Sequence, residues 1–216
     1  MNILNQYKKI KKNVEDYSFN IPVNLIVVTK GRSLADIQKI INAGHIHFGE
    51  NRVQESINKW KDILKTNADI KLHFIGKLQT NKVADVIPHF SYIHSIDNEK
   101  LALKISAEEK KLNKTLNYFV QVNLGEENQK SGILKQDLSR FISYCKNDLK
   151  LNIIGLMCLP PINEDSDKYF KELRQLAFDN NLKELSMGMS NDYVAAIKNG
   201  STFVRVGSSI FEEKFN

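Results

Sequence analysis

A lysine at the end of an apolar run is the first residue that could do chemistry. The run Asn24-Leu25-Ile26-Val27-Val28-Thr29-Lys30 is mostly apolar and β-branched, and Gly31 follows it. We predict a strand here that is buried on both faces, as in a parallel sheet. Ligands collect at the carboxyl ends of such strands, and burial disfavours an ammonium, so the amine could attack a carbonyl carbon. The alternative is a lysine that extends to solvent and only ends the strand.

Two glycine- and serine-rich segments near the end of the chain could hold an anion. They read Gly188-Met189-Ser190-Asn191 and Gly207-Ser208-Ser209, and each follows a predicted strand. Glycines let backbone N–H groups approach a phosphate, and the hydroxyls add donors. The alternative is that Ser190 and Ser209 are helix caps, and Ser209 with Glu212 matches a capping box.

Arg205 stands in the middle of the last predicted strand, Phe203-Val204-Arg205-Val206-Gly207. Alternation places it on the face opposite Val204 and Val206, so it points either into a barrel interior or toward the helices. A buried guanidinium needs a partner on either face. An inward arginine beside an anion site and an amine would suit a ligand with an aldehyde, a phosphate and one further acceptor.

Pyridoxal 5′-phosphate has all three of these groups. Lys30 would form the Schiff base, the last two loops would hold the phosphate, and Arg205 would donate to the pyridine nitrogen. Arginine does not give up its proton, so the ring nitrogen would stay unprotonated and the cofactor would be a weak electron sink. Such a site suits holding the cofactor, or mild racemase-like proton exchange, better than transamination.

The elements that would position these residues alternate regularly along the chain. Eight short apolar strands are expected at 24–30, 45–50, 71–76, 92–96, 117–123, 152–157, 184–187 and 203–207, with helices between them and one before the first. This alternation predicts a parallel sheet, and eight units fit a closed (β/α)₈ TIM barrel with an extra N-terminal helix. An open doubly wound sheet is the alternative, but no G-x-G-x-x-G follows the first strand. We expect residues 1–216 to form this single domain.

Composition narrows the classes of protein. The 216 residues carry a formal charge of +6, mostly from lysines spread over presumed helix surfaces, with no aromatic-interleaved basic patch, so no nucleic-acid partner is expected. No apolar run reaches bilayer length, and the N-terminus lacks the apolar core of a signal peptide. Two cysteines without metal spacing fit a reduced, cytoplasmic setting. His45 and His47 could bind a metal, but a third ligand at matching spacing is absent, so we predict no metal.

The chain resembles, nearly end to end, the YggS/PROSC group, the pyridoxal phosphate homeostasis proteins. The matching stretches occur in order and read VVTKGRS, FGENRVQE, LHFIGKLQTNK, SIDN, VQVNLGEENQKSG, IIGLMCLPP and LSMGMSNDYVAAIKNGSTFVRVGSSIF. The resemblance implies a fold type III barrel like the N-terminal domain of alanine racemase, with pyridoxal phosphate bound to Lys30. The other cofactor-binding positions that it implies are Asn51, Ser190, Arg205, Gly207 and Ser208.

Two residues depart from the family pattern. Thr29 stands where a serine is usual, which keeps the hydroxyl. Glu212 stands where a glycine is usual after the final IF. A carboxylate one turn from the expected phosphate would weaken binding unless it folds back onto the Ser209 N–H group, as the capping box suggests.

Three functions remain to be separated. The first is a non-catalytic module that holds pyridoxal phosphate for intracellular homeostasis or for delivery to pyridoxal-phosphate-dependent apoenzymes, as a monomer or weak dimer. The second is an amino-acid racemase, which needs a second base; Tyr193 or a partner subunit would have to supply it. The third is a class I aldolase, which gives Arg205 no obvious role. The first is favoured, and it requires no catalytic residue.

Overall fold

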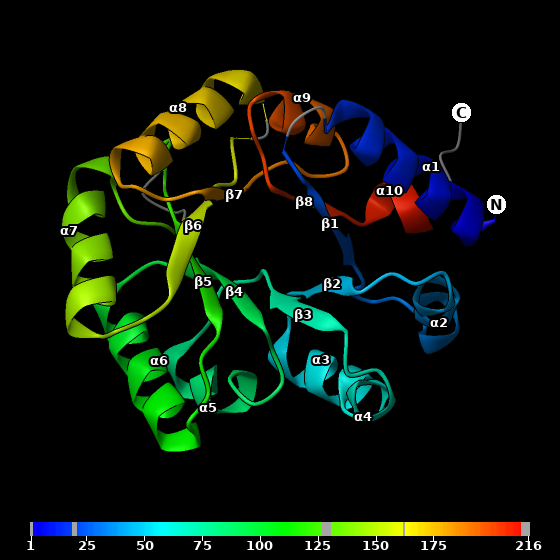
Figure 1. Cartoon of the computed structure of the whole chain (residues 1–216), viewed down its shortest axis with the longest axis horizontal. Coiled ribbons are helices and arrows are strands. Elements are labelled where there is room, and N and C mark those ends of the chain that lie inside the picture. The colour runs from blue at the N-terminus through cyan, green and yellow to red at the C-terminus, as the bar shows by residue number, and fades with distance from the viewer. Residues whose placement is uncertain (1, 19–20, 127–130, 162, 213–216) are drawn as a thin grey trace.

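The computed structural model describes residues 2–18, 21–126, 131–161 and 163–212. Its eight strands are all parallel and close into a barrel in sequence order, with β1 paired to both β2 and β8. Helices surround the barrel, and α1 lies beside α9 and α10 (Figure 1). The (β/α)₈ prediction is confirmed, and the open doubly wound alternative is excluded.

The elements follow the predicted order. The strands are β1 Asn24–Val28, β2 His47–Glu50, β3 Lys71–Phe74, β4 Tyr92–Ile96, β5 Asn117–Gln121, β6 Ile153–Met157, β7 Glu184–Ser186 and β8 Phe203–Val206. The helices are α1 Ile3–Tyr17, α2 Leu34–Asn42, α3 Val53–Trp60, α4 Ile63–Thr66, α5 Val83–Val86, α6 Glu99–Leu112, α7 Leu138–Ser143, α8 Ser166–Asp179, α9 Tyr193–Lys198 and α10 Ser208–Phe211. Short 3₁₀ segments at Thr80–Lys82 and Lys135–Asp137 precede α5 and α7, and a π-helical turn at Tyr144–Asp148 follows α7.

Three local predictions need correction. The first strand ends at Val28 rather than at Lys30. Val53, Ile57, Trp60 and Leu64 form one apolar stripe, which predicts a single helix over 53–64, but the helix breaks after Trp60 and resumes at Ile63. Asp97 stands where it could cap the helix that begins at Glu99, but the cap of α6 is Asn98, whose side chain accepts from the Leu101 N–H group. Ser33 precedes Leu34 and is a typical helix cap, and it does cap α2, through the Asp36 N–H group.

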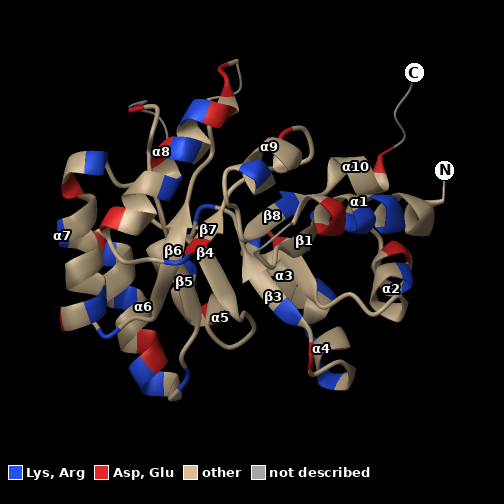
Figure 2. Cartoon of the chain, turned by 45° about the horizontal axis from the view of Figure 1, so that its top comes forward, with Lys and Arg blue, Asp and Glu red and all other residues tan. Residues whose placement is uncertain are grey.

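Alternation along the strands separates an inner and an outer set of side chains. Ile26, Phe119, Met157 and Phe203 form a small apolar cluster of their own inside the barrel. A much larger cluster joins the other faces of the strands to the helices. Charged residues lie mainly on the helices and loops (Figure 2), and no helix in the described ranges is long and apolar enough to cross a bilayer.

A buried histidine ties α1 to the barrel. The His45 Nε2–H group donates to the His47 carbonyl at 2.8 Å, which leaves Nδ1 to accept from the Tyr7 hydroxyl at 3.2 Å. Burial lowers the pKa of His45 to about 4 from its ordinary 6.5. The unfolded chain therefore takes up this proton first as the pH falls.

Acidification should destabilise the fold through His45. Because the folded-state pKa is the lower one, stability is lost as the pH falls from about 6.5 to 4, and His45 contributes about 3 kcal/mol of that loss. Urea unfolding at pH 7 and pH 4.5 measures it, with a His45→Asn variant as the reference. Equal pH slopes for the two proteins would show that His45 is not held neutral in the folded state.

Candidate functional site

The predicted site residues follow four neighbouring strands at one end of the barrel. Lys30 comes after β1, Asn51 after β2, Ser190 after β7, and Gly207 and Ser208 after β8. The closed order places β7, β8, β1 and β2 side by side, with Val27 level with Val206 and Val28 level with Gly49. The carboxyl ends of these strands therefore meet at one rim, which is where barrels bind ligands.

Lys30 does not have the buried stem that we expected. It lies in a turn two residues beyond the end of β1 and is exposed. Burial therefore gives no reason for an unusually reactive amine, and that part of the prediction is wrong. It still follows the strand that pairs with β2 and β8, so it lies at the rim where the carboxyl ends of these strands meet.

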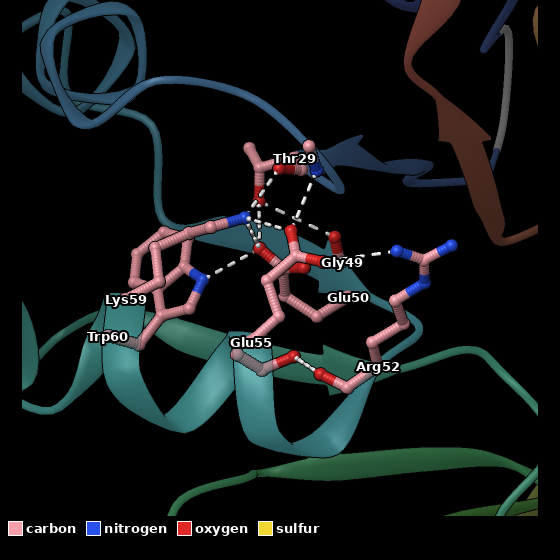
Figure 3. Close-up of polar contacts among 9 residues, drawn as sticks. Thr29, Gly49, Glu50, Arg52, Glu55, Lys59 and Trp60 are labelled. Atoms are coloured by element: carbon pink, nitrogen blue, oxygen red, sulfur yellow. Dashed lines mark hydrogen bonds and ion pairs between the residues drawn. The ribbon is translucent and has the colours of Figure 1, made fainter.

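The backbone on both sides of Lys30 is held by α3 and by the end of β2, and Figure 3 shows the contacts of Thr29, the residue before it. The Lys59 ammonium donates to the Thr29 carbonyl at 2.8 Å, and the Gly31 N–H group donates to a Glu55 carboxylate oxygen at 2.8 Å. Lys59 also donates to Glu55, at 3.2 Å. These bonds position the loop that carries the amine.

Glu50 is the centre of this network. Its Oε1 atom accepts from the Thr29 hydroxyl at 2.7 Å, the Lys59 ammonium at 2.9 Å and the Trp60 indole N–H group at 2.9 Å. Glu50 is fully buried, and the Lys59 side chain is only 8% exposed. Thr29 thus uses the hydroxyl that it shares with serine. From sequence, Glu50 is only the last residue of the strand predicted at 45–50, whereas the Glu55–Lys59 spacing of four residues indicates a helical pair.

Asn51 offers an unpaired acceptor at the rim. Its Oδ1 atom is buried and has no hydrogen-bond partner among the described residues. Gly76, after β3, holds this residue from the other side, since a Cβ atom on Gly76 would lie 2.4 Å from the Asn51 carbonyl oxygen. A buried oxygen without a partner is costly, so a ligand donor or a water is expected there.

The loops after β7 and β8 bring two backbone donors to one oxygen. The N–H groups of Gly207 and Ser209 both donate to the Ser190 hydroxyl oxygen, at 3.3 and 3.4 Å. The Ser209 hydroxyl donates back to the Ser190 carbonyl at 3.3 Å, while Ser208 is exposed. A phosphate oxygen could take the place of the hydroxyl oxygen, because both accept from the same N–H groups.

Gly188 makes this loop possible and offers a stability test. Its φ is +90°, and an added Cβ atom would lie 2.5 Å from the Ala196 side chain. Gly188→Ala should therefore cost about 2–4 kcal/mol in the free energy of unfolding. Gly44→Ala is the control, because Gly44 also has a positive φ, +79°, but no atom within 4 Å of the added Cβ. Equal urea midpoints for the two variants would contradict the close packing of Gly188.

Arg205 points into the barrel and is buried, at 4% exposure. Its Nη1 atom donates to the Ser186 hydroxyl at 2.6 Å, and Nη2 donates to the Cys158 carbonyl at 3.1 Å. Burial lowers the pKa of the guanidinium, which nonetheless stays charged in proteins. The inward alternative for Arg205 is confirmed. Its partners are neutral oxygens, and the remaining N–H groups can serve a ligand.

Glu212 does not form the expected capping box. Its carboxylate pairs with Arg32 in the loop after β1, and Arg32 also lies over the Phe211 ring at 5.3 Å from the centroid. The Ser209 N–H group donates to Ser190 instead. The ion pair offsets the negative charge one turn from Ser209 and links the loop that carries Lys30 to α10.

The two other groups considered from sequence lie elsewhere. The Tyr193 hydroxyl, on α9, accepts from the Asn13 side chain at 3.1 Å, so it faces α1. His45 contacts Tyr7, whereas the His47 ring pairs with His73 inside the barrel. No group of three metal-ligating side chains suited to an ion occurs among the described residues.

The polar groups at this rim fit a small anionic ligand that carries a carbonyl group. The rim offers a primary amine, two convergent backbone N–H groups, a buried guanidinium with N–H groups to spare, and an unpaired amide oxygen at Asn51. The amine could attack a carbonyl carbon, and the other groups could orient the ligand. Ser186, His73 and His94, which lie behind Arg205, were missed by the sequence analysis.

Comparison with known proteins adds a family. Residues 6–214 match the family model described as "Alanine racemase, N-terminal domain". A pyridoxal phosphate homeostasis protein of Synechocystis sp. is 38% identical over 201 residues, which are 89% of this chain and 92% of that protein. The protein of the same name from Pasteurella multocida is 34% identical over 199 residues, 88% of this chain and 85% of its own length.

Solved structures agree with these relatives. PipY of Synechococcus elongatus, determined without PLP, is 32% identical, covers 97% of this chain and 100% of its own, and has a TM-score of 0.88. The structure of PipY with PLP bound has a TM-score of 0.86 at the same coverage. Alanine racemase from Corynebacterium glutamicum, 12% identical, has a TM-score of 0.73 over 99% of this chain and 61% of its own, which indicates a shared fold.

Proposed function

Since this chain belongs to the family of pyridoxal phosphate homeostasis proteins, we propose that it binds pyridoxal phosphate through Lys30 and serves its homeostasis. The observation that carries the proposal is the pair of N–H groups, from Gly207 and Ser209, that converge on one oxygen. They follow the strand that pairs with the lysine strand, so one ligand could meet both. The PLP-bound structure of PipY supports the choice of ligand.

Each site residue then has a separate task. Pyridoxal phosphate supplies an aldehyde, which a primary amine can attack, and a phosphate. Lys30 would hold the aldehyde carbon, and Ser190, Gly207 and Ser208 would hold the phosphate. Arg205 would donate to the pyridine nitrogen and, because a guanidinium does not give up its proton, would leave that nitrogen unprotonated. The Asn51 amide would orient the ligand at the rim.

Such a site favours holding over catalysis. Strong electron withdrawal from a bound amino acid needs a protonated ring, which an arginine partner does not provide. The Tyr193 hydroxyl, the one candidate for a second base that the sequence suggested, faces α1. We therefore propose a carrier that passes the cofactor to pyridoxal-phosphate-dependent apoenzymes. It would act in the cytoplasm as a monomer or weak dimer, with residues 1–216 as one domain.

Reconstitution tests this proposal. The purified chain should be incubated with pyridoxal phosphate and then desalted. We expect it to absorb visible light, with an intensity that corresponds to one cofactor per chain. Borohydride reduction followed by peptide mass mapping should place the label on Lys30. Absence of any visible band after reconstitution would refute the binding role. Incubation with L-alanine should leave the optical rotation unchanged, and a steady loss of rotation would instead support a racemase.

A further inference from the structure

A line of three histidines runs through the barrel interior behind Arg205. Starting from the Ser186 hydroxyl, which Arg205 contacts, the His94 Nδ1 atom lies at 2.8 Å. The His94 Nε2 atom lies 2.9 Å from His73 Nδ1, and His73 Nε2 lies 2.9 Å from His47 Nδ1. The four contacts join strands β8, β7, β4, β3 and β2 in one continuous chain.

The direction of every hydrogen bond in this chain is set at the arginine. A guanidinium can only donate, so the Ser186 oxygen accepts from Arg205, and the hydroxyl proton goes to His94 Nδ1 because no other acceptor lies in contact with it among the described residues. His94 then carries its proton on Nε2 and donates to His73, and His73 donates in the same way to His47. Each imidazole in the chain is therefore the Nε2–H tautomer.

Packing holds the inner rings in place. The His73 ring stacks on Tyr92 at 4.2 Å between centroids, and the His94 ring stacks on Phe119 at 4.3 Å. Both histidines are 0% exposed, and burial lowers their pKa well below the ordinary value, which keeps the rings neutral. A neutral ring with both nitrogens paired has one tautomer that satisfies its neighbours.

The line of hydrogen bonds ends at His47, at the end of the barrel opposite the rim that carries Lys30. His47, the first residue of β2, is half-buried and lines a surface pocket together with Lys11, Glu15 and His45. Arg205 lies toward the opposite rim, after Phe203 of β8, which is level with Ser186. The inner line of polar groups thus extends from the ligand site through the barrel.

We propose that Ser186, His94, His73 and His47 are positioning residues for Arg205. They form a line of hydrogen bonds, called the relay below, in which each group donates to the next one away from the guanidinium, and the guanidinium sets this direction. The relay fixes the Nη1 atom, and the Cys158 carbonyl fixes Nη2, so that the remaining N–H groups are held toward the ligand. The positioning role rests on the proposed function, whereas the tautomer pattern depends on the protein alone.

Nitrogen NMR of the histidine-labelled chain without cofactor tests the direction. Long-range proton–nitrogen correlations distinguish the two tautomers, and single replacements assign the rings. We expect His94, His73 and His47 all to be neutral and protonated on Nε2. Finding any of the three in the Nδ1–H form, or doubly protonated at pH 7, would overturn the relay.

Variants at the two ends test what sets the direction. Arg205→Met leaves the buried Ser186 oxygen without its donor, so His94 can donate to it and an Nδ1–H population should appear at His94, while Arg205→Lys retains a donor and should not produce it. His47→Phe removes the last acceptor only, so His94 and His73 should keep the Nε2–H form. A tautomer change in His47→Phe, or none in Arg205→Met, would refute control by the arginine; a failure of Arg205→Met to fold leaves the other proteins to decide.

Ser186→Ala tests the positioning. It should raise the dissociation constant of pyridoxal phosphate about 10-fold, the equivalent of one lost hydrogen bond. Ser95→Ala is the matched control, because Ser95 is a buried strand hydroxyl at 2% exposure without a partner among the described residues. Equal binding by the two variants would overturn the positioning role. If the wild-type chain shows the Nε2–H form at all three histidines but binds no pyridoxal phosphate, the proposed function is refuted while the direction of the hydrogen bonds stands.

Discussion

Lys30→Ala should abolish the visible absorption of the protein reconstituted with pyridoxal phosphate. The amine is the group proposed to bond the aldehyde, and neither Arg205 nor the loops proposed to hold the phosphate can replace that bond. The phosphate contacts should remain, so we expect weak binding that does not survive desalting, with a dissociation constant about 100-fold higher, a loss of about 2.7 kcal/mol. Absorption after desalting measures the first effect, and equilibrium dialysis measures the second.

Lys77→Ala is the matched control for this experiment. Lys77 is also an exposed lysine just after a strand, at the same rim, but it follows β3 rather than β1. The variant should bind pyridoxal phosphate as the wild type does. Full absorption in Lys30→Ala, or its loss only in Lys77→Ala, would assign the bond to a different lysine and would remove the role proposed for the loop after β1.

The exposure of Lys30 changes the reason for expecting it to react. Sequence suggested a buried amine activated by desolvation, but the structure places Lys30 in solvent. What distinguishes it is the fixed backbone on either side, through Lys59 at Thr29 and Glu55 at Gly31. An amine on a fixed loop beside an anion site reacts through proximity to a ligand that other groups orient.

The barrel could be predicted because its signals are local. A run such as Leu25–Val28 is apolar over a few residues, and Ser33 before Leu34 marks a helix start without reference to anything distant. Regular alternation then leaves few parallel topologies. Strand ends shifted by one or two residues, as at Lys30, because pairing with the neighbouring strand decides where a strand stops.

The interior polar chain could not be predicted because it depends on register. His73 and His94 each stand in a strand at an inward position, but they are 21 residues apart, and His94 is 92 residues from Ser186. The capping box at Glu212 failed for the same reason: the carboxylate pairs with Arg32, 180 residues earlier, and the Ser209 N–H group donates to Ser190. The spacing of residues within one segment cannot predict a partner that is distant in the sequence.

Lys59→Met should be the most destabilising single change in the support of the site. It leaves the Glu50 carboxylate, which is fully buried, without its cation, and breaking a buried ion pair on one side costs about 3–5 kcal/mol. Urea unfolding measures this free energy. Lys65→Met is the control, since Lys65 and Asp62 form an exposed pair, at 73% and 71% exposure, which is worth about 0–1 kcal/mol.

The double variant Glu50→Gln, Lys59→Met separates charge from packing. With both charges removed, the amide oxygen introduced by Glu50→Gln can still accept from the Thr29 hydroxyl and the Trp60 indole, so stability should recover by more than half of the Lys59→Met loss. Reconstitution should stay weak in the double variant, because a thioether cannot donate to the Thr29 carbonyl and the loop that carries Lys30 loses that support. Full recovery of both stability and cofactor binding would show that the loop needs no ammonium at this position; recovery of neither would mean that the Lys59 stem, rather than its charge, supports the barrel rim.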